Sequence, residues 1–347
     1  MRFADNRNKI GKYIPAVVFL IFIYGMALWF IFSPKPDYSS SEKRYLQKFP
    51  EVTAEKLLSG DFGSEFETFF ADRFPQRNTW VGLNAYTALA VGNNGASGVY
   101  NCKNGYLINK PVSTENNLDK NIGAVADFAK SIDTPTTVML VPSTGYIVDD
   151  VLPTFHDKYN DDEDISKISS TLSKDKIGFV DLRERFKSEY KNGSQLYYKT
   201  DHHWTTKGAY TGYQELCKAL GITPIDDSTL KKDSYPDFYG TTYSSSGFWL
   251  TPPDNIEIWN NPKNSDRNIS VKITEGANIK TSGSMYFTDH LKEDDKYPVF
   301  IDGNHALTEI TNTNAKNGTI LLIKDSFSHS LAPFLAENYS KVVLVDL

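Results

Sequence analysis

The stretch YYKTDHHWTTKGAY, residues 197–210, places an acid and two bases side by side. The whole chain of 347 residues has six histidines, and two of them, His202 and His203, directly follow Asp201. In an extended backbone residues i and i+2 project to the same side, so Asp201 and His203 are expected to face one site while His202 faces away. A carboxylate that accepts from an imidazole N–H holds the ring and stabilises its cation. This pair is the orienting half of a Ser-His-Asp triad.

A candidate nucleophile lies more than a hundred residues further along, in LLIKDSFSHSLAPF, residues 321–334. Ser326 follows an apolar stretch that predicts a strand and precedes a stretch that predicts a helix. Ligands of parallel α/β sheets bind at the carboxyl ends of the strands, and a helix start offers N–H groups and a positive dipole to an oxyanion. This is the arrangement of a nucleophile elbow, without its G-x-S-x-G sequence. The residues therefore predict acyl transfer in which His203 takes the proton of Ser326.

The same residues allow other interpretations. Ser326 is also a favoured helix N-cap, and His203 can be a structural histidine bonded to Asp201. His202 becomes the alternative base if the local backbone is helical. A metal ion could bind residues 201–203, but adjacent histidines seldom reach one ion and no third-ligand cluster is nearby. We expect no metal and no cofactor, and we expect the tryptophan of the motif to be a core residue.

TDHHW and the later IKDSFSHSLAPFL resemble the DHHW family of membrane-anchored bacterial proteins, which is similar to the alginate O-acetylation proteins with an SGNH-hydrolase-like domain. The segments EKRYLQKFP, FFADRFPQRN, GVYNCKNGYLI and FIDGNHALTEITN also resemble parts of the family. By position, the resemblance implies that Ser326 is the nucleophile, His203 the base and Asp201 the residue that orients the base. The chain departs from the SGNH enzymes at Lys324, where their Gly-Asp-Ser has glycine.

Further site residues are named on weaker grounds. No segment matches the glycine and asparagine oxyanion donors of the SGNH enzymes, so Gly303 and Asn304 are proposed from residue type alone. Phe327 is included because backbone N–H groups at a helix start can hold an oxyanion. Lys199 is a candidate for contact with the substrate, and His329 is expected to line the rim of the site.

The N-terminal region predicts a membrane anchor. Residues 13–32, YIPAVVFLIFIYGMALWFIF, carry no charge, and a helix of that length crosses a hydrocarbon core of about 30 Å. Four basic residues precede the run (Arg2, Arg7, Lys9 and Lys12), which places that side in the cytoplasm. A cleaved signal peptide is the alternative, but the run exceeds the usual apolar region of roughly 7–15 residues and no small-x-small site follows it. We expect a single-pass signal anchor in the cell membrane.

This anchor sets the expected domain organisation. Residues 1–12 form a cytoplasmic basic tail, 13–32 the anchor, 33–45 a polar spacer and 46–347 an extracytoplasmic SGNH-hydrolase-like domain. Residues 98–108 predict a β-hairpin. Helices are expected at 118–132, 164–175, 206–220 and 328–339, and strands at 136–142, 177–182, 318–325 and 341–347. Their alternation favours an α/β fold with a mainly parallel sheet flanked by helices. Residues 221–317 look like a loop-rich insertion with some strand, which either lines the site or is surface padding.

Composition limits the class of partner. A formal net charge of −6 argues against nucleic acid, whose phosphates need a basic face. The hydrophobic fraction of 40% and the charged fraction of 23% are typical of a globular fold. Cys102 and Cys217 can form one disulfide outside the cytoplasm. Cys217 also lies on the apolar stripe of the helix expected at 206–220, which equally predicts a buried free thiol. Neither cysteine has a catalytic signature.

Together these observations predict a membrane-anchored O-acetyltransferase that modifies a cell-surface or secreted polysaccharide through an acetyl-enzyme. Acetyl-coenzyme A is cytoplasmic, and the resemblance implies a membrane-bound O-acyltransferase as the partner that supplies acetyl groups. A polysaccharide acetylesterase with the same triad is the first alternative. A non-catalytic glycan-binding or scaffold protein of the cell surface and a metal-dependent hydrolase are the others.

Overall fold

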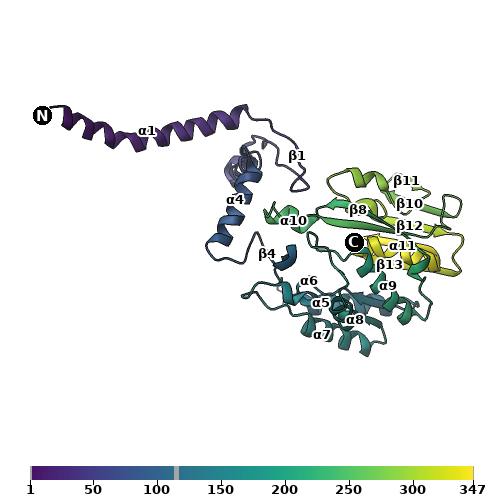
Figure 1. Ribbon diagram of the computed structural model, residues 1–347. Coiled ribbons are helices and arrows are strands. Elements are labelled where there is room, and N and C mark those ends of the chain that lie inside the picture. The colour runs from purple at the N-terminus through teal and green to yellow at the C-terminus, as the bar shows by residue number, and fades with distance from the viewer. Residues whose placement is uncertain (1, 113–116, 347) are drawn as a thin grey trace. The chain divides into compact units, whose positions relative to one another are not determined.

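A computed structural model describes residues 2–112 and 117–346, with side chains from residue 13 onward. The chain divides into two compact units, residues 1–83 and residues 84–347, and the boundary lies within helix α4 (Arg77–Ala90). Figure 1 shows the elements of both units.

The first unit begins with the long helix α1 (Arg2–Phe32). Within the described residues, α1 is the helix long and apolar enough to cross a membrane, through its run Tyr13–Phe32, none of which is buried. A short antiparallel ladder of β1 (Tyr38–Ser39) and β2 (Arg44–Tyr45) follows. The unit continues with α2 (Ala54–Ser59), α3 (Asp61–Asp72) and the first part of α4.

The second unit contains the helices and strands that the sequence predicts for the α/β part of the chain, together with further short helices that it does not predict. Its helices are α5 (Leu118–Ser131), α6 (Thr144–Ile147), α7 (Asp161–Lys174), α8 (Arg183–Lys191), α9 (Thr206–Leu220), α10 (Thr241–Ser246) and α11 (Ser328–Asn338). The expected hairpin is present as β4 (Val99–Asn101) and β5 (Leu107–Asn109), with β3 (Gly95–Ala96) beside it. The expected strands at 136–142 and 177–182 are β6 (Thr137–Leu140) and β7 (Gly178–Asp181), which pair in parallel.

The largest sheet is mixed, so the expectation of a mainly parallel sheet is wrong for it. Its five strands lie in the order β11-β10-β12-β14-β13. The strands are β10 (Ile269–Glu275), β11 (Asn278–Ser282), β12 (Leu307–Asn312), β13 (Asn317–Lys324) and β14 (Tyr339–Asp346). Only the pair β13–β14, which is joined through helix α11, is parallel; the other pairs in this sheet are antiparallel. A helical crossover permits parallel pairing, whereas the short turn between β10 and β11 permits only antiparallel pairing.

The mixed sheet arises from residues 221–317, which hold more regular structure than expected. This segment contributes β10, β11 and β12 to the large sheet, and it also forms the antiparallel pair β8 (Lys231–Phe238) and β9 (Asp254–Asn260). Alternation of side chains along these strands is visible in the structure, where β10 buries Ile269, Val271 and Ile273 and exposes the residues between them. The segment is therefore part of the core.

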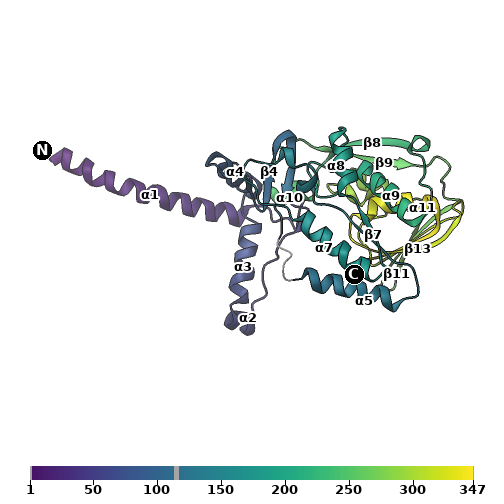
Figure 2. The same cartoon turned by 90° about the horizontal axis from the view of Figure 1, so that it is seen from below.

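Helices α9 and α11 contribute buried side chains to the hydrophobic core beside this sheet. They pack side by side, and α11 also packs against β14 and β12 (Figure 2). Thr205 caps the start of α9 by accepting from the N–H of Gly208, and Gly221 ends the helix in the left-handed conformation, as expected. Cys102 and Cys217 are both buried and free, so the structure agrees with the free-thiol alternative. Burial raises the pKa of Cys217 to about 11.

Candidate active site

The motif TDHHW forms a tight loop in place of the expected extended segment. The N–H of Tyr198 donates to the carbonyl of His203 at 3.2 Å, and the N–H of Thr205 donates to the carbonyl of Leu196 at 2.8 Å, which closes the loop at its base. At its tip, Asp201 Oδ1 accepts from the N–H of His203 at 2.8 Å. Asp201 and His203 face one another because this local hydrogen bond bends the chain, and strand alternation is not the cause.

Ser326 lies in the turn between β13 and α11, as the sequence predicts. The hydroxyl Oγ of Ser326 is 2.7 Å from Nε2 of His203, across 123 positions of sequence. The other ring nitrogen of His203, Nδ1, is hydrogen-bonded to Oδ1 of Asp201. Because an ionised carboxylate only accepts, Nδ1 carries the proton and Nε2 is left to accept the proton of the serine hydroxyl. The structure thus brings the three expected side chains into one hydrogen-bonded row.

Asp201 is buried and held from a second side. Its Oδ2 accepts from the backbone N–H of Thr241 at 2.7 Å and from the Thr241 hydroxyl at 3.2 Å. A Cβ atom on the neighbouring Gly240 would lie 2.1 Å from Cβ of Asp201, so only glycine fits at position 240. Burial by itself raises the pKa of Asp201, but the charge and hydrogen bonds of His203 hold that pKa well below its usual value. The carboxylate is therefore ionised and rigid.

A second buried carboxylate, Asp254, fixes the chain just before the motif. It accepts from the N–H groups of Lys199 at 3.0 Å and Thr200 at 2.8 Å, from the Thr200 hydroxyl at 2.7 Å and from the Gln195 amide at 3.1 Å. The amine of Lys199 lies over the ring of Tyr106, 5.5 Å from its centre. The backbone of Lys199 thus helps to hold the loop in place through Asp254, and no contact described for Lys199 reaches the serine.

Trp204 is a core residue, as expected, and it joins the motif to the helix that follows the serine. Its indole N–H lies 3.0 Å from the carbonyl of Phe327 and 2.9 Å from the hydroxyl of Ser330. Helix α9 has glycine where the ring rests on it, since a Cβ on Gly212 would lie 2.8 Å from Cζ3 of Trp204. The tryptophan therefore sets the distance between the histidine loop and α11.

We expect Trp204→Phe to lower kcat for the hydrolysis of p-nitrophenyl acetate by about tenfold or more. An aromatic ring remains in this variant, but both hydrogen bonds to the start of α11 are lost, and the serine shifts as a result. The loss of stability should be about 1–3 kcal/mol, as for a buried acceptor left without its donor. Steady-state kinetics and chemical unfolding measure both effects. Trp259→Phe is the matched control, since it removes an indole bond to Glu257 at 2.9 Å. Equal kinetics of the two variants would contradict this role of Trp204.

Tyr297 lies on the imidazole of His203. The two rings stack with centres 4.0 Å apart and planes 12° apart, and the Tyr297 hydroxyl donates to the carbonyl of Ser326 at 3.3 Å. Burial raises the pKa of Tyr297 well above its usual value, so the phenol stays neutral. An aromatic face favours a neighbouring cation, so this stacking would stabilise a protonated His203. The residue is absent from the sequence-based candidates because it lies in residues 221–317.

The other candidates have different places. The N–H of Phe327 donates to the exposed carboxylate of Asp325 at 3.0 Å. Asn304 Oδ1 accepts from the amine of Lys324 at 3.1 Å, and Gly303 forms a left-handed turn beside it with φ of 86°. Lys324 also donates to Asp346 at 2.7 Å. The contacts described for Gly303 and Asn304 do not reach the serine hydroxyl.

His329 is buried, so the expectation that it lines the rim of the site is wrong. The first turn of α11 directs the ring inward, and its Nε2 accepts from the amine of Lys324 at 2.9 Å, because an ammonium only donates. Burial first, and then the charge of Lys324, lower the pKa of His329 to about 3. His329 is consequently neutral at physiological pH.

This buried histidine predicts acid sensitivity of the fold. The unfolded chain binds a proton at His329 below about pH 6.5 and the folded chain does not, so stability falls as the pH drops from 6.5 towards 3. The loss is about 1.4 kcal/mol per pH unit, or about 3 kcal/mol at pH 4.5. His329→Gln keeps an acceptor for Lys324 and cannot charge. Urea unfolding at pH 7 and 4.5 should show a smaller drop for the variant; an identical drop would rule out this origin.

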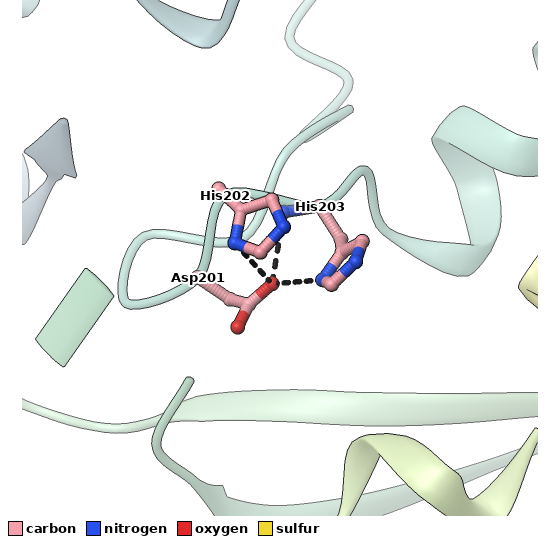
Figure 3. Close-up of side chains that lie close together, drawn as sticks. All are labelled: Asp201, His202 and His203. Atoms are coloured by element: carbon pink, nitrogen blue, oxygen red, sulfur yellow. Dashed lines mark hydrogen bonds and ion pairs between the residues drawn. The ribbon is translucent and has the colours of Figure 1, made fainter. Parts of the chain in front are cut away.

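His202 was expected to face away from the site, but its ring lies over that of His203. Figure 3 shows the two rings beside Asp201, with ring centres 3.9 Å apart. His202 Nδ1 is 2.7 Å from the Thr241 hydroxyl. The potential ligand atoms of Asp201, His202 and His203 lie within 4.8 Å of one another. However, both oxygens of Asp201 already accept two hydrogen bonds each, which uses the four lone-pair directions of a carboxylate. The geometry favours a hydrogen-bonded triad over a metal site.

Several solved structures are similar to this chain. A DHHW protein from Eubacterium siraeum is 18% identical over 72% of this chain and 83% of its own, with a TM-score of 0.59. Bacillus cereus PatB1, solved with a sulfonyl adduct, is 20% identical over 72% of this chain and 85% of its own, with a TM-score of 0.57. The O-acetyltransferase domain of Pseudomonas putida AlgJ has 13% identity over 72% and 80% of the two chains and a TM-score of 0.45. Comparison with the curated proteins found no match.

The family model described as "DHHW protein" matches residues 109–345, which is well over half of the chain. The matched region includes both segments that carry the resemblance, TDHHW and IKDSFSHSLAPFL. The family expected from these segments is thereby confirmed. This chain belongs to the DHHW family.

Proposed function

We propose that the protein is a membrane-anchored O-acetyltransferase that uses Ser326, His203 and Asp201 to modify a polysaccharide outside the cytoplasm. The observation that carries the proposal is the 2.7 Å contact between the Ser326 hydroxyl and Nε2 of His203, whose other nitrogen is held by the buried Asp201. A helix N-cap or a structural histidine does not require this alignment. Membership of the DHHW family supports the same reading.

The chemistry follows from the positions of these atoms. Nε2 of His203 takes the proton of Ser326 while Oγ attacks the carbonyl carbon of an acetyl ester, and the protonated His203 then gives the proton to the departing alcohol. In the second half, a sugar hydroxyl gives its proton to His203 and attacks the acetyl-serine. His203 then returns the proton to Oγ of Ser326 as the bond between the acetyl group and the serine breaks. Asp201 stabilises the imidazolium in both halves. Atoms and charge balance, and no cofactor is required.

The oxyanion is held, in this proposal, at the start of α11. The N–H of Phe327 is next to the nucleophile, and the helix dipole adds positive potential there. The carboxylate of Asp325 accepts that N–H in the structure. Because Asp325 is exposed, its side chain can rotate into solvent and leave the N–H to the developing oxyanion.

The anchor and the supply of acetyl groups belong to the same proposal. Residues 13–32 would span the membrane, with the tail 1–12 in the cytoplasm, the spacer 33–45 outside it and the domain from residue 46 in the extracytoplasmic space. Acetyl groups then have to cross the bilayer. The donor would be loaded by a membrane-bound O-acyltransferase, the partner class that the family resemblance implies.

A two-substrate assay tests the proposal. Purified full-length protein receives p-nitrophenyl acetate as donor and a neutral oligosaccharide as acceptor, and mass spectrometry follows the sugar. Transfer is expected to add about 42 Da to the oligosaccharide, the mass of an acetyl group less that of the hydrogen it replaces, as p-nitrophenol is released. Release of p-nitrophenol without acetylated sugar, across several classes of oligosaccharide, would indicate an acetylesterase. No release would contradict the enzymatic proposal.

A further inference from the structure

The first unit contains an apolar groove beside the anchor helix. The groove has a volume of about 630 Å³ and is lined by ten hydrophobic side chains. Six of them come from the last turns of α1, between Phe22 and Ile31, and the others are Phe66, Phe70, Phe74 and Trp80. The indole N–H of Trp80 donates within the chain to the carbonyl of Pro75 at 3.1 Å. The groove therefore offers no side-chain polar group for recognition of a water-soluble ligand.

Helix α3 carries a row of aromatic rings that packs in part on Phe30 of α1 and in part on Phe49. Phe62, Phe66, Phe69 and Phe70 recur at the spacing of one helix face. The rings of Phe70 and Phe69 contact Phe30, with centres 4.7 and 6.2 Å apart. Phe30 lies near the end of the uncharged run of α1, yet Phe66 and Phe70 remain 40% and 42% exposed. This row of phenylalanines is therefore only partly covered by the protein itself.

Arg73, at the end of α3, is bonded to the chain that directly follows α1. Its buried guanidinium donates to the carbonyls of Lys35 and Pro36 at 2.8 Å each and of Gln47 at 2.9 Å, and it pairs with Asp37 at 3.0 Å. Lys35, Pro36 and Asp37 follow within a few residues of the last turn of α1. The end of α3 is thus fastened to the place where the chain would leave a membrane, and Figure 2 shows α3 running across the direction of α1.

We propose that α3 is an interfacial helix whose phenylalanine face lies in the outer leaflet, and that lipid acyl chains fill the groove. The inference rests on the proposed anchor, and acetyl transfer is not needed for it. If residues 13–32 span the bilayer, the groove wall between Phe22 and Ile31 lies in hydrocarbon, where the surrounding molecules are lipid chains. A helix with one aromatic face and a polar opposite face, lying across the anchor, matches an in-plane amphipathic helix.

A fluorophore on each face of α3 tests this inference. Phe66→Cys and Ser64→Cys lie two residues apart on opposite faces, and both native cysteines are buried. Each full-length variant is labelled with nitrobenzoxadiazole and placed in phosphatidylcholine nanodiscs, with unmutated protein as the blank. Spin-labelled lipid should quench the label at position 66 several-fold more strongly than the label at 64, while iodide in the water should quench mainly position 64.

Equal quenching at the two positions would overturn the inference, as would a label at position 66 that iodide reaches freely. The second result would mean that water, and not lipid, surrounds this face. Washing vesicles with alkaline carbonate separates this inference from the anchor proposal. A chain that leaves the vesicles contradicts the anchor and the inference together, whereas a retained chain with a water-exposed label contradicts the interfacial helix alone.

Discussion

Replacing Ser326 with alanine is expected to lower kcat/KM for p-nitrophenyl acetate by a factor of about 10³ or more, because the acyl group has no other acceptor in the row. The substitution removes one hydroxyl from a turn that is half-buried and leaves the bond between His203 and Asp201 in place. The fold should therefore be retained. The rate of p-nitrophenol release measures the effect, with circular dichroism as the check on folding.

Ser328→Ala is the matched control for this variant. Ser328 lies two residues away, at the first position of α11, and no contact described for it involves His203. Its variant should keep the rate of the unmutated protein within about twofold, because it removes a hydroxyl outside the proposed reacting row. A Ser326→Ala protein with more than a tenth of the original activity would mean that another group is the nucleophile.

Asp201→Asn is expected to cost a factor of about 10³–10⁴ in kcat/KM, as loss of the orienting carboxylate does in other triads. Asp201 accepts from the side chain and backbone of His203 with one oxygen and from Thr241 with the other. An asparagine has a single acceptor oxygen, so its NH₂ group must face a donor on one of the two sides. Either His203 loses its orientation or the loop loses its attachment to Thr241.

Kinetics and thermal unfolding of the Asp201→Asn protein should be compared with those of Asp289→Asn. Asp289 is an exposed aspartate whose side chain is 92% accessible and pairs with Lys292 at the surface, so its variant changes the same charge away from the site. Unchanged kinetics are expected for that control. An Asp201→Asn protein within threefold of the original rate would show that His203 does not depend on this carboxylate.

Much of the fold can be predicted from local patterns. The helix at 206–220, its Thr205 cap and its Gly221 end are all found in the structure, because these signals act within a few residues of the chain. The direction in which two strands pair depends on residues far apart in the sequence, so local patterns do not predict it. Alternating helices and strands suggested a mainly parallel sheet, but β10, β11 and β12 join from residues 221–317 in the antiparallel sense. Their period-two pattern was hidden by frequent Gly, Ser, Asn and Pro in the loops between them.

The residues of the candidate site also fall into those that the sequence predicts and those that only the folded structure shows. Ser326, His203 and Asp201 could be selected by residue type, position relative to predicted elements and resemblance to the DHHW family, and the structure brings their side chains together. The groups that hold these three side chains in place could not be selected from the sequence. Thr241 and Tyr297 reach the site only through tertiary packing, and neither has a neighbouring residue that would suggest a role. A glycine where only a missing Cβ allows close approach, such as Gly240 beside Asp201, is likewise visible only in three dimensions.

The central claim is that Ser326 is a nucleophile activated by His203, and chemical labelling tests it most directly. A sulfonyl fluoride reacts with a serine hydroxyl that a neighbouring base activates, so it is a suitable probe for this chain. Full-length protein treated with phenylmethylsulfonyl fluoride and digested should carry the adduct on the peptide that contains Ser326, and His203→Gln should abolish the labelling. An unmodified Ser326 in folded protein, or labelling that persists unchanged without His203, would contradict the account.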